Sequence, residues 1–512
     1  MTTADAPTRR KRGPIVIAFL TLAMIVAFWT LLVDNRQFQI MGTYLALILG
    51  AMMFAAWALV FSGWPVLRRF VPAAVLGALL VGTLSLVEVR GVTGDWIPVW
   101  NWRFAGGAAG DIERSGEGAG SSLGRFPAFL GPQGNSRIDD VQLAADWDAE
   151  PPVKIWQRDI GAGWAGFAIE GDIAYTLEQR EDREVVSAYR LSDGEELWAQ
   201  GEEAYFSNPI AGPGPRTTPA LAESALFALG ASGDLWALDK SDGSVLWHRN
   251  VVEETKAPIP EHGKSSSPLL VDGLVVVSAG GPEGNSLVAY RQEDGEIAWS
   301  SGSDKSSYSS PVRALLGGMD QIVTLNDASI SGHGTEDGTL LWQQDYPGSW
   351  PNVAPPLVLD RDRVLFSSGY GIGSRVLEIG APNSSSGTQA ATKLWESPRM
   401  KAKFTNLVYY DGFVYGLDDG VFVCLDPETG ERVWKKGRYG HGNILLVGKH
   451  LLVQTEKGDM VLLEATPEGH NELGKFTALR GKAWNPLAFA APYLLVRNDE
   501  EAALWKLPLA AS

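Results

Sequence analysis

The chain has 512 residues, among them 58 glycines, 19 tryptophans and a single cysteine, and its formal net charge is −17 at pH 7. This length exceeds one ordinary compact domain, and the abundant glycine and tryptophan favour one large array of short strands joined by tight turns. The acidic charge argues against a nucleic-acid partner, because phosphate binding depends on clustered Lys and Arg. One cysteine excludes an intramolecular disulfide and a Cys-rich metal site.

Three apolar runs come first along the chain: Gly13–Val33, Ile40–Phe61 and Phe70–Val87. At roughly 1.5 Å rise per residue, each is about long enough to cross a hydrocarbon core of about 30 Å. None contains a charge that would mark a proton or quinone path. We therefore expect residues 13–90 to form a plain three-helix membrane anchor. The alternative for the first run is a cleaved signal peptide, but the run is too long and no small-x-small cleavage pattern follows it.

Basic residues predict the orientation of this anchor. They precede the first run and separate the second from the third, as Arg9, Arg10, Lys11 and Arg12 and as Arg68 and Arg69. Such clusters stay on the cytoplasmic side of a membrane. We expect residues 1–12 to be cytoplasmic, and the loop Asp34–Gln37 and everything after the third run to lie outside. In a Gram-negative cell this is an inner-membrane protein whose remaining chain faces the periplasm.

Residues 91–125 form a connection. The amphipathic stretch Trp96–Phe104 carries Trp and Arg side chains typical of the headgroup level, so it is expected on the outer membrane surface. Gly106–Gly124 is rich in Gly, Ala and Ser and predicts a flexible linker. The glycines at 116, 118 and 120 indicate no phosphate loop, because no strand precedes them and no helix follows.

Beyond residue 150 one pattern recurs: an apolar strand, a turn with Asp-Gly or Thr-Gly, and a strand that ends in Trp. Clear copies are Ala188–Trp198, Ala237–Trp247 and Ala289–Trp299; others end at Trp342, Trp395 and Trp434, and a degenerate one ends near Phe476. Asp and Gly tolerate the positive φ of a two-residue hairpin. The Trp ring is expected to fill the wedge between adjacent blades while its N–H finds a backbone carbonyl. All-strand repeats about forty to fifty residues apart predict a propeller.

The number of repeats predicts the number of blades. Seven anchors run from Trp198 to Phe476. Val153–Trp156 looks like an outer strand with no inner strands before it, and Leu487–Val496 and Ala502–Leu507 look like inner strands with no outer strand after them. Joining these pieces completes one blade and removes exposed sheet edges. The predicted fold is all-β, an eight-bladed propeller over residues 126–508 preceded by three transmembrane α-helices.

The motif Ala-Leu-Asp-x-x-x-Gly-x-x-x-Trp at residues 237–247, with its variant at 424–434, resembles the repeat of pyrroloquinoline-quinone (PQQ) type propellers. Segments similar to those of bacterial, often membrane-anchored PQQ-like propeller proteins are Phe126–Asn135, Arg216–Pro219, Ser367–Gly371 and Leu462–Gly469. The resemblance spans about 126–508 and implies the fold. The family includes quinoprotein alcohol and glucose dehydrogenases and the propeller lipoprotein of the outer-membrane barrel-assembly complex. The vicinal Cys pair, calcium ligands and catalytic Asp of the dehydrogenases match no residues here, and the lipid-attachment Cys of the lipoprotein is absent.

A candidate binding site follows from repeat geometry, because the loops that lead into the innermost strands line one mouth of the channel. Aligning the repeats on the start of that strand gives one residue per blade: Trp164, Arg216, Lys264, Tyr308, Asn352, Lys403, His441 and Lys482. Four of these are cationic, and a cationic funnel attracts anions. PQQ is a tricarboxylate with a flat face, so the ring is a candidate site for an anionic small molecule, including PQQ with calcium. The alternative is the solvated rim of a wet channel.

Other chemistry is sparse in the sequence. The histidines lie in different repeats without ligand spacing, so no zinc site is expected. Cys424 sits in a strand motif and is expected to be buried. Gly369–Gly373 is interpreted as an inter-strand turn, because a strand and not a helix follows it. No Ser-His-Asp or paired-carboxylate arrangement is visible.

We therefore expect no catalytic residues and a membrane-tethered periplasmic propeller that acts as a non-enzymatic scaffold for another cell-envelope protein or peptide. The alternative is a membrane-bound, PQQ-dependent quinoprotein dehydrogenase that oxidises an alcohol or a sugar. The anchor, the repeat family and the cationic mouth favour it, whereas the missing disulfide and calcium ligands argue against it.

Overall fold

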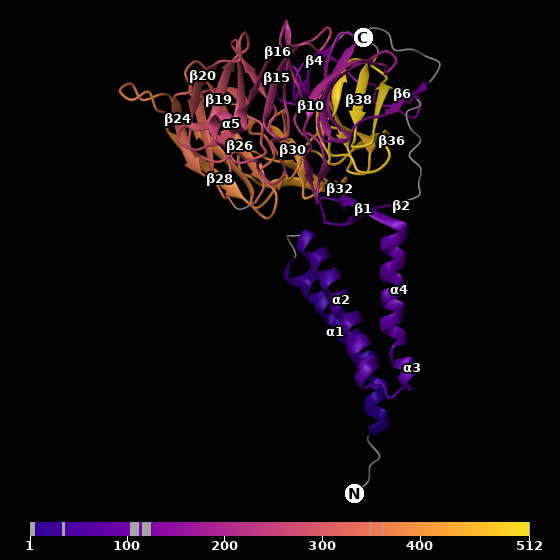
Figure 1. Ribbon diagram of the computed structural model, residues 1–512. Coiled ribbons are helices and arrows are strands. Elements are labelled where there is room, and N and C mark those ends of the chain that lie inside the picture. Colours follow the sequence, from indigo (N-terminus) through magenta and orange to yellow (C-terminus); the bar gives the residue numbers. More distant parts are fainter. Residues whose placement is uncertain are drawn as a thin grey trace. The chain divides into compact units, whose positions relative to one another are not determined.

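The computed structural model describes residues 6–32, 36–102, 112–114, 124–348, 350–360 and 362–510. The chain divides into two compact units, Met1–Ala108 and Ala109–Ser512. The first unit contains four helices and a small hairpin, and the second contains the blades (Figure 1). Most of the predicted linker 106–124, and residues 34 and 35 of the predicted outer loop, lie outside the described residues.

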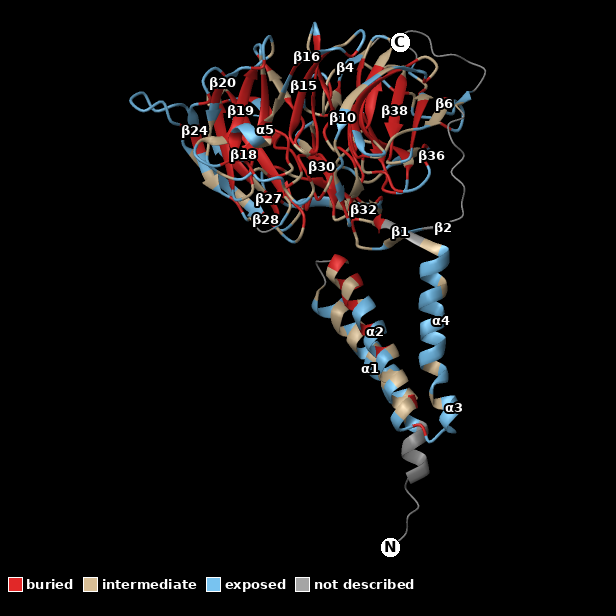
Figure 2. Cartoon of the chain, viewed as in Figure 1, coloured by how far each residue is buried: buried red, intermediate tan, exposed pale blue. Residues whose placement is uncertain are grey.

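The helices of the first unit are α1 (Ala6–Leu31), α2 (Arg36–Val60), α3 (Val66–Arg69) and α4 (Val71–Leu86). Within the described residues, two stretches are long and apolar enough to cross a membrane, Arg12–Leu31 and Arg36–Val60. The third predicted run forms α4, which has only 16 residues and no buried side chain (Figure 2). It is shorter than expected because the chain turns into strand at Val87. The structure thus contains two candidate spans where the sequence predicted three.

A two-stranded hairpin follows α4. Strand β1 (Val87–Val92) pairs antiparallel with β2 (Pro98–Trp102). The Arg36 guanidinium at the start of α2 forms an ion pair of 2.8 Å with Asp95 in the hairpin turn. The predicted amphipathic stretch that begins at Trp96 is therefore part of the turn and the second strand, and the expected anchor end at residue 90 falls inside β1.

The described residues of the second unit form eight sheets of four or five strands (Figure 1). From the channel outward, blade 1 contains β7 (Ala168–Glu170), β8 (Ile173–Arg180), β9 (Arg183–Arg190) and β10 (Glu196–Glu203); blade 2 contains β13 (Ala220–Leu221), β14 (Ala225–Leu229), β15 (Asp234–Asp239) and β16 (Val245–Asn250); blade 3 contains β17 (Leu269–Val271), β18 (Leu274–Gly281), β19 (Asn285–Arg291) and β20 (Ile297–Ser301); blade 4 contains β21 (Val312–Leu316), β22 (Met319–Leu325), β23 (Ser329–Gly334) and β24 (Leu340–Asp345).

The second half of the ring repeats this order. Blade 5 contains β25 (Leu357–Val358), β26 (Arg363–Ser368), β27 (Gly373–Ile379) and β28 (Ala391–Ser397); blade 6 contains β29 (Val408–Tyr410), β30 (Phe413–Asp418), β31 (Val421–Leu425) and β32 (Arg432–Arg438); blade 7 contains β33 (Ile444–Val447), β34 (His450–Gln454), β35 (Asp459–Glu464) and β36 (Glu472–Thr477); blade 8 contains β37 (Ala488–Ala490), β38 (Tyr493–Arg497), β39 (Glu501–Lys506) and β6 (Val153–Asp159). Smaller elements are β3 (Glu113–Arg114), β4 (Arg125–Phe126), β5 (Arg137–Ile138), β11 (Ser207–Asn208), β12 (Gly212–Pro213) and α5 (Val251–Thr255).

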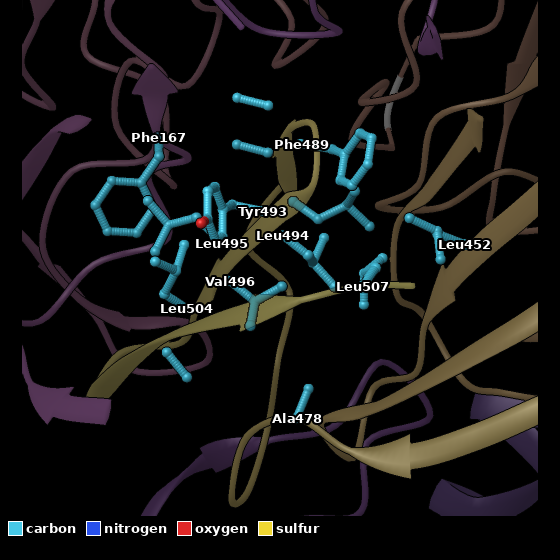
Figure 3. Packing of buried hydrophobic residues seen from close by; sticks show 14 of the residues in the cluster. Phe167, Leu452, Ala478, Phe489, Tyr493, Leu494, Leu495, Val496, Leu504 and Leu507 are labelled. Atoms are coloured by element: carbon cyan, nitrogen blue, oxygen red, sulfur yellow. The ribbon is translucent and has the colours of Figure 1, made fainter. Parts of the chain in front are cut away.

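Blade 8 closes the ring as the sequence predicted. Its outer strand β6 pairs antiparallel with β39, from Glu501 opposite Asp159 to Lys506 opposite Val153. β3, a described piece of the predicted linker, adds to the far side of β6. Figure 3 shows the blade 8 side chains between Phe167, next to blade 1, and Leu452 of blade 7, all in one buried cluster. The first and last large strands of the propeller therefore share one sheet and one core, which removes two exposed sheet edges.

A buried polar network also joins blade 8 to blade 1. Arg497 is fully buried and donates hydrogen bonds to Thr176 Oγ1 at 2.7 Å and to the carbonyls of Leu177 and Gly161 at 2.9 and 2.7 Å. Burial alone raises the pKa of the nearby Glu178 carboxyl, but the Arg180 and Arg497 guanidiniums lower that pKa overall. The closing seam thus combines apolar packing with buried charges that have partners.

Tryptophan docking explains the recurring motif. The Trp198 indole N–H of blade 1 donates to the Lys240 carbonyl of blade 2 at 3.2 Å, and Trp247 donates to Gln292 of the next blade at 2.9 Å. Gly243 has a φ of +75°, and a Cβ there would lie 2.5 Å from the Trp198 ring. Glycine is therefore required both by the backbone and by the docked indole. The connection is longer than the predicted two-residue hairpin, since residues 240–244 separate β15 from β16.

Candidate functional site

One end of the propeller channel is crossed by residues 124–138, which we call the cross-channel segment. Its first strand, β4, pairs with the innermost strand β7 of blade 1, and its last strand, β5, pairs with the innermost strand β33 of blade 7. Both pairings reach the carboxyl ends of the inner strands, at Glu170 and Val447. The sequence placed this stretch before the first strand and did not predict that it enters the ring.

The middle of the cross-channel segment touches further blades. The Pro127 carbonyl accepts a hydrogen bond from the Leu221 amide of blade 2 at 2.8 Å, and Leu130 packs against the core shared by blades 4 and 5. The Asn406 side chain, just before blade 6, donates to Ser136 Oγ at 2.6 Å. A small hollow remains between the segment and the residues at the start of the inner strands of blades 6 to 8. The segment therefore obstructs the channel at this end.

The predicted ring of eight residues lies before the amino ends of the inner strands, at the opposite mouth. It divides into two halves. In the half that we call the bonded half, formed by Arg216, Lys264, Tyr308 and Asn352 of blades 2 to 5, polar atoms are hydrogen-bonded within the protein. The other half, formed by Lys403, His441, Lys482 and Trp164 of blades 6, 7, 8 and 1, is dominated by aromatic contacts.

Lys264 and Asn352 are the most enclosed members of the bonded half, each with 3% or less of its surface exposed. The Lys264 ammonium donates to the Ala279 carbonyl and to Ser306 Oγ. Burial lowers its pKa to about 8. The Asn352 amide donates to the carbonyls of residues 326, 327 and 347 at 3.2, 3.1 and 3.4 Å, and its oxygen accepts from Ser368 Oγ at 2.6 Å. These two side chains tie adjacent loops together.

Arg216 and Tyr308 complete the bonded half. The Arg216 guanidinium donates to the Gly214 and Gly212 carbonyls at 2.7 and 3.0 Å and lies 5.1 Å over the Phe206 ring. Burial lowers the pKa of Arg216 to about 10. The Tyr308 hydroxyl accepts a hydrogen bond from the His262 amide at 3.4 Å. The Arg216 guanidinium and the Tyr308 hydroxyl are therefore also hydrogen-bonded to backbone atoms of the protein.

In the other half, aromatic rings and two lysines form a continuous row, which we call the aromatic arc: Trp350, Tyr370, Phe404, Trp484 and Trp164, with Lys403 and Lys482. Trp350 stacks on Tyr370 at 5.1 Å with an interplanar angle of 10°, and Trp484 lies 5.1 Å from both Phe404 and Trp164. The Lys403 ammonium lies 4.7 Å from the Tyr370 ring, and that of Lys482 lies 4.1 Å from the Trp484 ring. The Lys403 ammonium links the two groups, since it also lies 5.6 Å from the Phe404 ring. Cation–π contacts of this kind hold an ammonium at a flat apolar surface.

Side chains around the arc hold it in place. The Trp484 indole N–H donates to the Glu456 carboxylate at 2.8 Å, and that of Trp164 donates to the Ala211 carbonyl at 2.6 Å. The His441 ring lies 5.7 Å from Phe404. Burial lowers the pKa of Lys482, although the nearby Asp499 and Glu456 carboxylates act in the opposite direction.

Trp484 and Tyr370 were absent from the predicted ring. Trp484 is two residues after Lys482, and alignment on a single position per blade passes over it. Tyr370 comes from the turn between β26 and β27, which confirms that Gly369–Gly373 is an inter-strand turn. This residue has a φ of +58°. A search for aromatic side chains on either side of each ring position would have found Trp484 but not Tyr370, which comes from a different loop of its blade. Cys424 is fully buried in β31, as predicted.

The arc provides flat faces and positive charge, which suit a planar anion, but a calcium-bound quinone also needs clustered oxygen ligands. Among the described residues, the group of three carboxylate or imidazole ligand atoms within 4.8 Å of one another is Glu202, Asp234 and His248, on strands β10, β15 and β16. Within the described part of the chain, this group lies between blades 1 and 2 and contains no residue of the predicted ring.

Comparison with known proteins is consistent with the repeat pattern. Residues 181–436, half of the chain, match the family model described as outer membrane protein assembly factor BamB. BamB of Yersinia pestis is 22% identical over 379 residues, which covers 69% of this chain and 78% of that protein. BamB of Moranella endobia (strain PCIT) is 22% identical over 320 residues, which covers 57% of this chain and 74% of that protein.

One solved structure supports the propeller architecture. Quinohemoprotein alcohol dehydrogenase from Comamonas testosteroni has a TM-score of 0.54 at 13% identity, with 76% of this chain and 82% of that chain covered. BamB from Moraxella catarrhalis has a TM-score of 0.48 at 16% identity, with 70% of this chain and 100% of that chain covered. At these identities the dehydrogenase supports the propeller fold and says nothing of chemistry.

Proposed function

The chain belongs to the family described as outer membrane protein assembly factor BamB, and from this membership we propose that it is a non-enzymatic scaffold that binds a polypeptide partner of the cell envelope. The half of the chain that matches the family covers blades 2 to 5 and parts of blades 1 and 6. The chain is a BamB-like propeller, and the channel mouth indicates what kind of partner it binds.

The observation that carries the proposal is the aromatic arc. Its rings present flat apolar faces, and Trp350 is 41% exposed. Aromatic side chains in a partly enclosed pocket are typical anchors of protein interfaces. The buried Lys403 and Lys482 side chains, 3% and 8% exposed, place positive charge directly behind these rings. The arc therefore suits an acidic side chain or a terminal carboxylate of a partner chain with an apolar neighbour, inserted into the open mouth.

The bonded half and the cross-channel segment support the same proposal. Because Lys264 and Asn352 are engaged within the protein, they offer little to a small molecule. Because residues 124–138 obstruct the far end, a partner enters the channel from the mouth only. A propeller with one open mouth is a docking platform and needs no reacting group.

We further propose that α1, α2 and the shorter apolar helix α4 each cross the inner membrane, because a cytoplasmic N-terminus and a periplasmic propeller require an odd number of crossings. Support comes from the two candidate spans, from the apolar helix Val71–Leu86, and from the basic residues 9–12 and 68–69, which come just before the first and third of these apolar stretches. In a Cys424→Ala background, a membrane-impermeant maleimide applied to intact spheroplasts should label Thr93→Cys but not Ser62→Cys. The opposite labelling pattern would reverse the orientation, and labelling of both positions would refute a crossing by α4, the apolar helix between them.

The scaffold is tested by photo-crosslinking. A benzoyl-phenylalanine at Tyr370, in the arc, should crosslink an envelope protein or an outer-membrane protein precursor in living cells. The same group at Leu246, which is 52% exposed on β16, is the matched control. The adduct at 370 should disappear in the double variant Lys403→Gln/Lys482→Gln, because that variant removes the charge but keeps the rings.

Two results would contradict the scaffold. One is a crosslink at residue 370 that persists in the double lysine variant with the same yield as the crosslink at residue 246. This result would show that the aromatic arc does not bind the partner. The other is dye reduction by the purified membrane protein with PQQ, calcium and an alcohol or sugar, which would make the chain a quinoprotein dehydrogenase. A protein adduct confined to the arc, with no dye reduction, would support the scaffold.

A further inference from the structure

A histidine and two carboxylates meet between blades 1 and 2, far apart in the sequence. Glu202 lies on β10 of blade 1, and Asp234 and His248 lie on β15 and β16 of blade 2. One ligand atom of each lies within 4.8 Å of the others. The distance from His248 Nε2 is 3.2 Å to Asp234 Oδ1 and 3.6 Å to Glu202 Oε1.

Strand register places all three on the same interface. Trp236 is opposite His248 and Asp234 is opposite Asn250 across β15 and β16, so these side chains share one face. That face packs against blade 1, since Trp236 belongs to the core that also contains Val186 and Ala188 of β9. Glu202 is opposite Glu184 across β9 and β10, and its exposed side chain lies at the edge of the same interface.

Neighbouring side chains orient the ligand atoms. The Asn250 amide donates to Asp234 Oδ1 at 2.8 Å, and the Trp236 ring stacks on the His248 imidazole at 5.6 Å with an interplanar angle of 18°. Such support fixes the ring plane and the carboxylate of a metal ligand before an ion arrives.

The local charge favours a cation. Glu184 is 2% exposed, and like charges opposite each other in a sheet are destabilising. Within the described part of the chain, no Lys or Arg forms an ion pair with Glu184, Asp234 or Glu202, and His248 is the ionic partner of Asp234 and Glu202. One imidazole cannot neutralise three acids.

The distances fit tetrahedral coordination. Zinc binds imidazole nitrogen and carboxylate oxygen at about 2.0–2.1 Å, which separates two ligand atoms of a tetrahedron by about 3.3 Å. The two observed distances bracket this value. Calcium and magnesium prefer oxygen ligands alone, so the imidazole selects a transition metal.

The propeller repeat does not require these residues. Register-equivalent positions between blades 2 and 3 are Val251, Ser286 and Ser300, and those between blades 3 and 4 are Ser303, Ser329 and Gln343. Neither set contains an acid or a histidine. Glu202, Asp234 and His248 are therefore specific to the interface between blades 1 and 2 and are not part of the propeller repeat.

We propose that Glu202, Asp234 and His248 bind a divalent transition-metal ion of the zinc type, with water as the fourth ligand, and that the ion ties blade 1 to blade 2. The sequence indicated no zinc site because the histidines lack ligand spacing along the chain. The ligands come instead from three strands of two blades, and only the assembled ring brings them together.

Calorimetry on the full-length, detergent-solubilised protein tests the site after dialysis against a chelator. Titration with Zn²⁺ should show one site per chain that His248→Gln and Asp234→Asn each weaken at least tenfold. Glu202→Gln, at a partly exposed position, should weaken it without disturbing the fold. Glu203→Gln is the matched control, because it removes the same charge one residue along on the other face of β10, and it should bind like the wild type.

A spectrum and a melting curve complete the test. Co²⁺ in place of Zn²⁺ should give the intense visible absorption of tetrahedral cobalt in the wild type and in Glu203→Gln, but not in His248→Gln. Zinc should raise the melting temperature of the wild type and leave that of Asp234→Asn unchanged. The site is refuted if the wild type shows no zinc heat, or if Glu202→Gln and His248→Gln retain wild-type affinity while circular dichroism shows that they are folded.

Discussion

The two halves of the channel mouth occupy equivalent positions of one repeat and differ in what their polar groups do. In the bonded half, the Lys264 ammonium and the Asn352 amide are engaged with backbone carbonyls. In the aromatic arc, the Lys403 and Lys482 ammonium groups lie over aromatic rings. At these four residues the ring position is thus buried in both halves, and it contacts backbone carbonyls in one half and aromatic rings in the other.

The difference teaches that charge alone does not identify a binding residue. Four ring positions are cationic in the sequence, yet Arg216 and Lys264 donate to carbonyls of their own fold. Such buried donors stabilise the folded state and are not available to a ligand. Leaving a buried carbonyl without its donor costs about 1–3 kcal/mol. Substitutions in the two halves should therefore act on different measurements.

The largest effect is expected at Asn352. Replacing Asn352 with Ala removes the amide that holds three carbonyls and the acceptor of Ser368. Several buried groups then lack partners, and the free energy of unfolding should fall by about 4 kcal/mol. Urea unfolding followed by tryptophan fluorescence measures this loss. A loss below about 1 kcal/mol would show that water replaces the amide and that the bonded half is less rigid than its contacts indicate.

A pH-dependent effect is expected at Lys264. Its pKa is lowered to about 8 by burial, so the folded state loses its proton before the unfolded state does. Between about pH 8 and the ordinary lysine pKa of about 10.4, the unfolded chain binds more protons and stability rises with pH. Relative to Lys264→Met, the wild type should gain up to about 3 kcal/mol of stability over this range. Parallel stability curves for the two proteins would contradict burial of a charged Lys264.

The smallest effect on stability is expected in the arc. Lys403→Gln/Lys482→Gln keeps the rings and removes two charges, and it should change the free energy of unfolding by no more than about 1 kcal/mol. Affinity for the crosslinked partner should nevertheless fall at least tenfold, measured by calorimetry with the purified partner. Loss of stability as large as that of Asn352→Ala would place the arc with the bonded half and remove the contrast.

Much of the fold was predictable because the repeat is local. The Trp-docking motif, the eight blades and the closure through β6 all follow from patterns within about eleven residues and from the need to remove open edges. The turn at residues 369–373 and the burial of Cys424 were predicted for the same reason. The third helix was overestimated, since an apolar run does not reveal where the chain turns into strand at Val87.

The candidate site was predictable only as a set of positions. Repeat alignment located one residue per blade, because every blade presents the same loop to the mouth. It did not separate Lys264 from Lys482, because the distinction depends on a carbonyl of Ala279 in one case and on the rings of Trp164 and Trp484 in the other.

By itself, then, the sequence determined the propeller, its number of blades and the positions around its mouth, since these depend on strand periodicity and turn chemistry along the chain. Tertiary structure alone decided which mouth residues are engaged within the protein, how residues 124–138 cross the channel, and how Glu202, Asp234 and His248 meet. The physical reason is distance along the chain. Contacts between blades join residues that no local pattern relates, and they form only when the ring closes.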